Sequence, residues 1–231
     1  MPDNMLNNPV FVTGIERSGS SLMARIIQMC GAFSGRTTNM CENINLKVIT
    51  DDYYKRMGID TRGQYPLPNT LEMLIPLDWR DRVSNILGSE DYDEKTIWMY
   101  KGSRIMQIWP VWKNAYPNAR WVVVRRRTGD VIESCLKTGF MNAYNDKQIQ
   151  RIIGVKDERE GWLWWVHEQE KVLREMVGSG INWMEIWPER MLDGNFDQIH
   201  EMLNWLDLSW NPGIISLLEY TLIKGGNKNG K

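Results

Sequence analysis

Short apolar runs alternate with segments of helical periodicity along most of this chain. The strand-like runs are Val10–Val12, 96–100, 121–124 and 182–187, and apolar positions at helical spacing follow the first of them from residue 22 to residue 27. Alternation of strands and helices is typical of parallel sheets covered by helices on both faces. We therefore expect one domain over residues 1–231, a three-layer α/β/α fold with a mostly parallel sheet of four or five strands.

Two long segments depart from this alternation. Residues 51–95 are rich in glycine, proline and mixed charges, which predicts an irregular, partly helical excursion. Because specificity is often placed on connections carried by a rigid scaffold, this excursion is a candidate wall for a substrate pocket or a packed cover over the sheet. Residues 157–177 predict a long helix, in which Trp162, Trp165 and Gln169 share one face that favours core packing over ligand stacking.

The first strand leads into a glycine-bearing loop and then directly into a helix. Gly14 and Gly19 have the spacing of a phosphate loop, in which backbone N–H groups and a helix N-terminus bind an anion. Ser21 occupies the hydroxyl position of that motif, but Ser20 replaces its lysine, and the loop carries its positive charge on Arg17 instead. The simplest alternative is a serine N-cap and a glycine turn that only begin a helix.

The loop sequence GIERSGSS, followed by an apolar helix, resembles the 5′-phosphosulfate loop of sulfotransferases that use 3′-phosphoadenosine 5′-phosphosulfate (PAPS). The resemblance implies a fold related to that of nucleotide kinases. It also implies that the donor is bound by the loop residues, which are Gly14, Arg17, Ser18, Gly19, Ser20 and Ser21.

A second landmark of that family is a strand followed by a lysine and a short turn. Lys101 matches the lysine, and the resemblance implies a cation beside the bridging oxygen of the leaving group, although an exposed lysine at a strand end is the alternative. Ser103 stands where the cytosolic animal enzymes have a catalytic histidine, so a histidine mechanism is not supported. Glu42 lies in the region that supplies a general base in many bacterial and Golgi-type members, and a solvated or helix-capping glutamate is the alternative.

The third landmark follows the run Trp121–Val124. Arg126, Asp130 and Ser134 reproduce the family pattern R-x-P-x-D-x-x-x-S, with Thr128 in place of the proline. The resemblance implies that Arg126 and Ser134 hold the 3′-phosphate of the donor, and a planar guanidinium is suited to phosphate oxygens.

The chain ends in a basic, glycine-rich segment. The cytosolic family members close over the nucleotide with such a segment, which makes Lys224 and Gly225 candidate donor-binding residues. The alternative is a flexible basic tail over residues 222–231.

Composition narrows the possible partners. The net charge of −1 argues against general binding to nucleic acid or to a membrane surface. Three widely separated cysteines without C-x-x-C spacing disfavour a zinc site or a disulfide framework, and the N-terminus has no secretory pattern. We expect a cytoplasmic protein that needs no metal.

The resemblance implies a PAPS-dependent sulfotransferase that acts on a hydroxyl or amine of a small molecule or glycan, with Glu42, Lys101 and Arg17 in catalysis and adenosine 3′,5′-bisphosphate as product. Two other functions stay open at this point. One is a phosphate-loop kinase of nucleotides or small molecules, and the other is a non-catalytic module that binds a phosphonucleotide. The sequence assigns neither an acceptor nor an oligomeric state.

Overall fold

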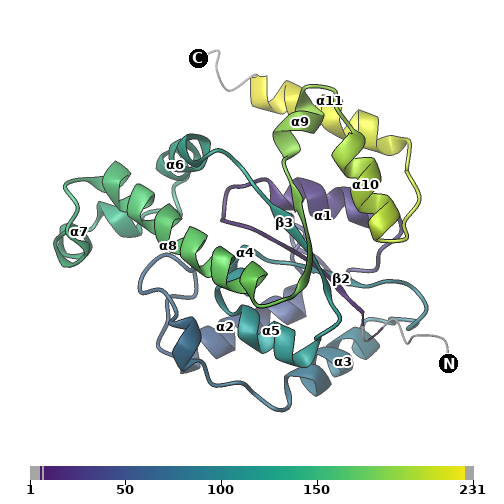
Figure 1. Ribbon diagram of the computed structural model, residues 1–231, viewed down its shortest axis with the longest axis horizontal. Coiled ribbons are helices and arrows are strands. Elements are labelled where there is room, and N and C mark those ends of the chain that lie inside the picture. The colour runs from purple at the N-terminus through teal and green to yellow at the C-terminus, as the bar shows by residue number, and fades with distance from the viewer. Residues whose placement is uncertain (1–5, 7, 227–231) are drawn as a thin grey trace.

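A four-stranded parallel sheet forms the centre of the molecule (Figure 1). The computed structural model describes residues 6 and 8–226. The strands are β1 (Val10–Thr13), β2 (Met99–Lys101), β3 (Arg120–Val124) and β4 (Asn182–Ile186). They lie in the order β2-β1-β3-β4, and every neighbouring pair is parallel. The expected three-layer α/β fold is confirmed.

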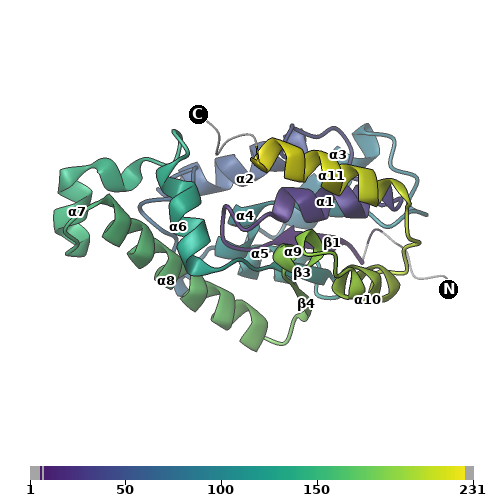
Figure 2. The same cartoon turned by 90° about the horizontal axis from the view of Figure 1, so that it is seen from above.

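One face of the sheet carries an aliphatic layer. Val10 and Val12 of β1 point to this face together with Val122 and Val124 of β3. The helices α1 (Ser20–Met29), α10 (Asp197–Trp205) and α11 (Gly213–Gly226) cover it, as Figures 1 and 2 show. The short helix α9 (Pro188–Leu192) follows β4 at the edge of this layer.

The opposite face carries an aromatic layer. Phe11 of β1 contacts the rings of Trp98, Trp112, Tyr116 and Trp121 at centroid separations from 4.7 to 6.0 Å. Edge-to-face pairs of this kind add to the stabilisation from burial. The helices that cover this face are α2 (Ile44–Arg56), α3 (Trp79–Ser89), α4 (Ser103–Gln107), α5 (Trp109–Ala115), α6 (Thr128–Leu136) and α8 (Glu158–Gly178).

The long helix α8 buries the face that its sequence predicts to pack in the core. Trp162, Trp165 and Gln169 are all buried, and the two tryptophans belong to the aromatic layer. At the N-terminal end of α8, the 3₁₀ turn η3 (Ala143–Asn145) and α7 (Lys147–Ile153) pack against this helix. Figures 1 and 2 show α7 extending away from the sheet at this end.

One predicted element differs from the structure. The single helix expected over residues 105–116 is divided into α4 and α5, because Pro110 has no N–H group and its ring would clash with the preceding turn of a continuous helix. The excursion over residues 51–95 contains the end of α2, the 3₁₀ turn η2 (Thr70–Glu72) and α3, with irregular segments between them. The helix α11 continues through Gly226, where a flexible tail from residue 222 was the alternative, and residues 227–231 lie outside the described part.

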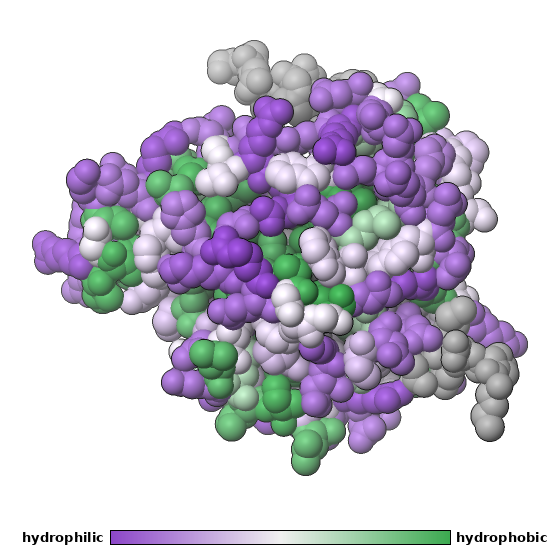
Figure 3. Space-filling model, viewed as in Figure 1, coloured by the Kyte–Doolittle hydropathy of each residue, from purple (hydrophilic) through white to green (hydrophobic). Residues whose placement is uncertain are grey.

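The surface is largely polar on the face shown in Figure 3, where hydrophobic side chains gather along the lower edge. Within the described part of the chain, Leu71, Leu74 and Leu77 are more exposed than any other large hydrophobic residue. All three lie in or beside η2, in the excursion that connects α2 to α3.

The conformation of Gly14 predicts how the fold responds to a single added methyl group. Its φ is +145°, and a Cβ at this position would lie 2.2 Å from the carbonyl oxygen of Val124. We expect Gly14→Ala to lower the free energy of unfolding by about 2–4 kcal/mol, measured by urea denaturation. The control is Gly88→Ala in α3, where a Cβ meets no atom within 4 Å and the substitution should stabilise the helix by about 0.5–1 kcal/mol. Equal stabilities of the two variants would contradict this account.

Candidate active site

The glycine loop connects β1 to α1 by a tightly curved backbone. Gly14 and Gly19 have positive φ angles, as does Arg17 with a φ of 72°. Gly19 is the N-cap of α1, and Ser20 and Ser21 form the first turn of that helix. The first N–H groups of a helix have no acceptor within the helix, so they point toward any anion at this end.

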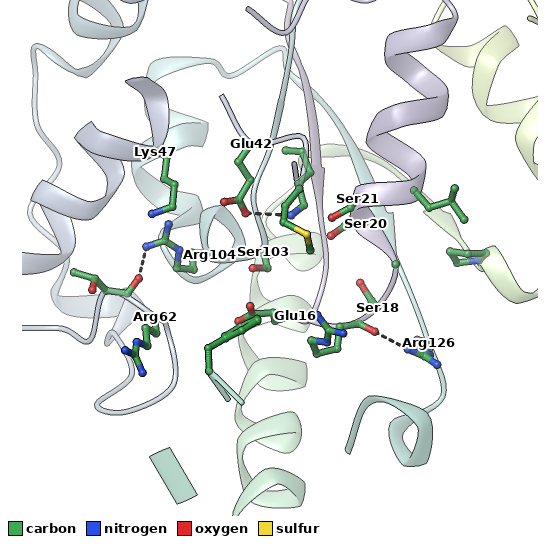
Figure 4. A pocket seen from close by; sticks show the side chains of 18 of the residues that line it. Glu16, Ser18, Ser20, Ser21, Glu42, Lys47, Arg62, Ser103, Arg104 and Arg126 are labelled. Carbon is green, nitrogen blue, oxygen red and sulfur yellow. Dashed lines mark hydrogen bonds and ion pairs between the residues drawn. The ribbon is translucent and has the colours of Figure 1, made fainter. Parts of the chain in front are cut away.

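A cavity of about 600 Å³ opens in front of this loop (Figure 4). Sequence analysis identified eight of the residues that line it. These are Arg17, Ser18, Gly19, Ser20, Ser21, Glu42, Lys101 and Arg126. Gly14 and Ser134 do not line it. Lys224 and Gly225 belong to the backbone of α11, but whether they contact the cavity lies outside what the structure describes.

The two arginine motifs meet at this cavity. Arg17 donates a hydrogen bond from Nε to Oγ of Ser134 at 2.9 Å, which links the glycine loop to α6. Arg126, two residues beyond β3, donates from Nη1 to the carbonyl oxygen of Arg17 at 3.1 Å. Segments more than 100 residues apart in the chain therefore form one cationic cradle, and Ser134 reaches the cavity through its contact with Arg17.

The loop also contains a buried hydroxyl group. Ser18 is 2% exposed, and within the described part of the chain its Oγ has no hydrogen-bond partner. A buried polar atom without a partner is costly, because it has lost its bonds to water. The Ser18 hydroxyl therefore favours a ligand in the cavity that can accept a hydrogen bond from it.

Glu42 and Lys101 form an ion pair at the cavity. Lys101 is the last residue of β2, beside Val12 in the sheet, and Glu42 precedes α2. The lysine Nζ lies 3.1 Å from Oε1 of Glu42, and the two side chains are only 5% and 17% exposed. The alternatives of an exposed lysine and a solvated glutamate are therefore wrong for these two residues.

A second carboxyl group in the cavity, that of Glu16, was missed by the sequence analysis. Burial raises the pKa of Glu16 to about 7, against the lowering effect of Lys101, and the nearby Glu42 raises it further. The only sequence signal was an acidic residue in the middle of a loop that otherwise carries arginine, serine and glycine.

Charged residues from α2 and α4 form another part of the cavity wall. Asp51 accepts hydrogen bonds from Arg104 and from Lys47, with the lysine Nζ at 2.6 Å. Burial acts to raise the pKa of Asp51, but these two hydrogen bonds outweigh it and the pKa is lowered. Arg104 also donates to the carbonyl oxygen of Thr61, so it ties the excursion to the helix that follows β2.

The adjoining wall, residues 60–65 and 140–144, is held to the core by hydrogen bonds. The carbonyl oxygen of Gly63 accepts from Nε2 of Gln107 at 2.9 Å and from Nε1 of Trp165 at 3.0 Å. Gln64 donates from its side chain to the carbonyl oxygen of Phe140 at 2.9 Å. These hydrogen bonds fix the position of the segments that carry three cavity-lining residues, Thr61, Arg62 and Phe140.

Two further observations concern only the part of the chain that the structure describes. There, no helix is both long and apolar enough to cross a membrane. The same residues contain no group of three or more histidine, cysteine, aspartate or glutamate side chains placed to hold a metal ion.

Comparisons with known proteins agree with the fold. The model of the sulfotransferase family matches residues 9–212. Among solved structures, the sulfotransferase domain from the curacin biosynthetic pathway has a TM-score of 0.58 at 12% identity, over 90% of this chain and 76% of that one. The sulfotransferase STF9 from Mycobacterium avium gives 0.48 at 14% identity, over 95% of this chain and 68% of that one. No curated protein gives a significant match.

The match to the curacin-pathway domain is below 25% identity and bears on the fold alone, whereas the family model spans most of the chain and includes the glycine loop, Lys101 and Arg126. The chain belongs to the sulfotransferase family and is an enzyme of that family.

Proposed function

We propose that this enzyme transfers a sulfuryl group from PAPS to a hydroxyl or amine of a small-molecule or glycan acceptor, leaving adenosine 3′,5′-bisphosphate. The observation that carries the proposal is the cradle formed by Arg17, Arg126 and Ser134. It brings the loop that matches a 5′-phosphosulfate site and the motif that matches a 3′-phosphate site to one cavity.

The described residues fit such a donor. The loop backbone, Ser20 and Ser21 would hold the 5′-phosphosulfate, and the partnerless hydroxyl of Ser18 would donate to one of its oxygens. Arg126 would bind the 3′-phosphate with its planar guanidinium, and Ser134 would support it through Arg17. When bound, PAPS supplies an activated sulfuryl group. The chain itself supplies binding, orientation and fixed positive charge.

The ion pair of Glu42 and Lys101 would supply the two remaining requirements, which are stabilisation of the leaving group and removal of the acceptor proton. Lys101 holds its ammonium group at the carboxyl end of β2, beside the loop, where it would stabilise negative charge on the leaving group. Glu42 would take the proton from the acceptor as general base. The 3.1 Å contact holds each group in place for the other.

Features of the loop and of β3 argue against the kinase alternative. A serine, Ser20, stands where a phosphate-loop kinase has its lysine. The strand β3 runs into Arg125, Arg126 and Arg127, whereas a magnesium-dependent enzyme of this class requires an aspartate at the end of a core strand. These arginines favour an anion without a bound metal.

The proposal is tested first by titration calorimetry with adenosine 3′,5′-bisphosphate, ADP and AMP, each with and without Mg²⁺. We expect adenosine 3′,5′-bisphosphate to bind most tightly and with no dependence on the metal, because Arg126 would bind its 3′-phosphate, which ADP and AMP lack. A preference for ADP that requires Mg²⁺ would overturn the proposal in favour of a kinase.

Arg126→Ala should weaken the binding of adenosine 3′,5′-bisphosphate by about 2–3 kcal/mol, since a charge-assisted contact is lost. AMP has no 3′-phosphate, so its affinity should change little. The matched control is Arg127→Ala, which removes a neighbouring guanidinium that pairs with Glu189 at 3.5 Å and is 79% exposed. The same calorimetric titrations measure all of these affinities. An Arg126→Ala variant with wild-type affinity would exclude the role assigned to Arg126.

Glu42→Gln should lower sulfuryl transfer at least about 100-fold, because the variant has no group to take the acceptor proton. The measurement is release of adenosine 3′,5′-bisphosphate from PAPS, with water or a panel of hydroxyl and amine compounds as acceptor. Lys101→Met should lower transfer similarly, and Glu72→Gln, at an exposed glutamate outside the cavity, should have no effect. Full activity in both cavity variants would exclude the roles assigned to Glu42 and Lys101.

A further inference from the structure

Glu16 is a carboxyl group inside a loop built for anions. It lies between Gly14 and Gly19, and it lines the same cavity as Ser18, Ser20 and Ser21 (Figure 4). A carboxylate at this position would repel a phosphate or sulfate group in the cavity. The proposed function gives Glu16 no role, so its presence requires a separate explanation.

The charged groups around Glu16 do not neutralise it by direct contact. Lys101 from β2, Arg104 from α4 and Arg17 from the loop all influence its ionisation, as does Glu42. Lys101 is paired with Glu42, Arg104 with Asp51, and Arg17 donates to Ser134.

No ion pair or hydrogen bond to the Glu16 side chain is found among the described residues. From α6, the buried thiol of Cys135 also faces Glu16, and burial, together with this carboxyl group, raises the pKa of the thiol.

Burial is consequently the largest influence on Glu16, and it raises the pKa of this carboxyl group to about 7. At neutral pH the protonated and ionised forms coexist. A bound anion adds like-charge repulsion, which disfavours the ionised form further. The protonated form, in contrast, has an O–H group that can donate to an anion.

We propose that Glu16 is a residue of the donor site that takes up a proton from solvent when the anionic nucleotide binds, and that its neutral carboxyl group donates a hydrogen bond to that nucleotide. The inference rests on the proposed function, because it requires adenosine 3′,5′-bisphosphate or PAPS to bind in this cavity. It adds to the cationic cradle a binding group that is neutral in the complex.

Calorimetric titration with adenosine 3′,5′-bisphosphate at pH 8, in two buffers of different ionisation enthalpy, measures the protons taken up. At this pH the ligand phosphates are already ionised, since their second pKa is near 6. We expect the wild-type protein to take up about 0.5–0.9 proton per ligand, and its affinity to fall about five- to fifteenfold from pH 7 to pH 8.5.

Glu16→Gln is the decisive variant, because its amide has the shape and the donor group of the neutral carboxyl. It should take up no proton, bind with an affinity that is constant over this pH range, and exceed the wild-type affinity at pH 8.5. Glu189→Gln is the matched control. Glu189 lines the same cavity but pairs with Arg126 and Arg127, so this variant should keep the wild-type proton uptake.

Absence of proton uptake by the wild-type protein would overturn the inference on its own, whether or not Glu16→Gln folds. Proton uptake that persists in a folded Glu16→Gln variant would overturn it as well. In both cases tight nucleotide binding would leave the proposed function intact. If the wild-type protein does not bind adenosine 3′,5′-bisphosphate, the proposed function fails and the inference fails with it.

Discussion

The close approach of the glycine loop to β3 is the constraint on which the site depends. The backbone at Gly14 lies so near the carbonyl oxygen of Val124 that a side chain has no room between them. This contact places the loop directly beside the residues that follow β3, and Arg126 can then reach the carbonyl oxygen of Arg17. The strand order puts β2 on the other side of β1, which brings Lys101 to the same loop. The tight contact and the strand order together bring groups from three strands to one loop.

The two layers over the sheet give this arrangement its rigidity. The aliphatic layer packs α1 against β1 and β3, so the helix that begins at the anion loop has a defined direction. The aromatic layer buries six tryptophans completely, and one of them, Trp165, also donates to the carbonyl oxygen of Gly63 in the cavity wall. Large buried rings have few alternative packings. The nearly neutral chain therefore keeps its cations at fixed points around one cavity, where their local field is strong although the net charge is small.

Features that depend on local sequence were predictable, and features that depend on contacts between distant segments were not. The strands, the glycine loop and α8 follow from periodicity and glycine spacing. The group of Lys47, Asp51 and Arg104 could not be foreseen, because it forms only when α2 packs beside α4. Glu16 was visible in the sequence, but its burial depends on the surrounding elements. The division into α4 and α5 had a local cause in Pro110, which the helical pattern of its neighbours concealed.

The attachment of residues 60–65 to the core has a consequence for how this wall of the cavity could be redesigned. Gly63 is bound by Gln107 and Trp165, and Gln64 is bound to the segment that contains Phe140. Grafting this loop from a relative would break hydrogen bonds to α4 and α8 unless their residues were exchanged with it. The exposed side chain of Arg62 donates to Oδ1 of Asn142 at 3.2 Å, at the surface, and makes none of the hydrogen bonds to α4 and α8. Redesign of the cavity therefore has an accessible starting point in side-chain replacements at this wall, with the backbone left as a fixed frame.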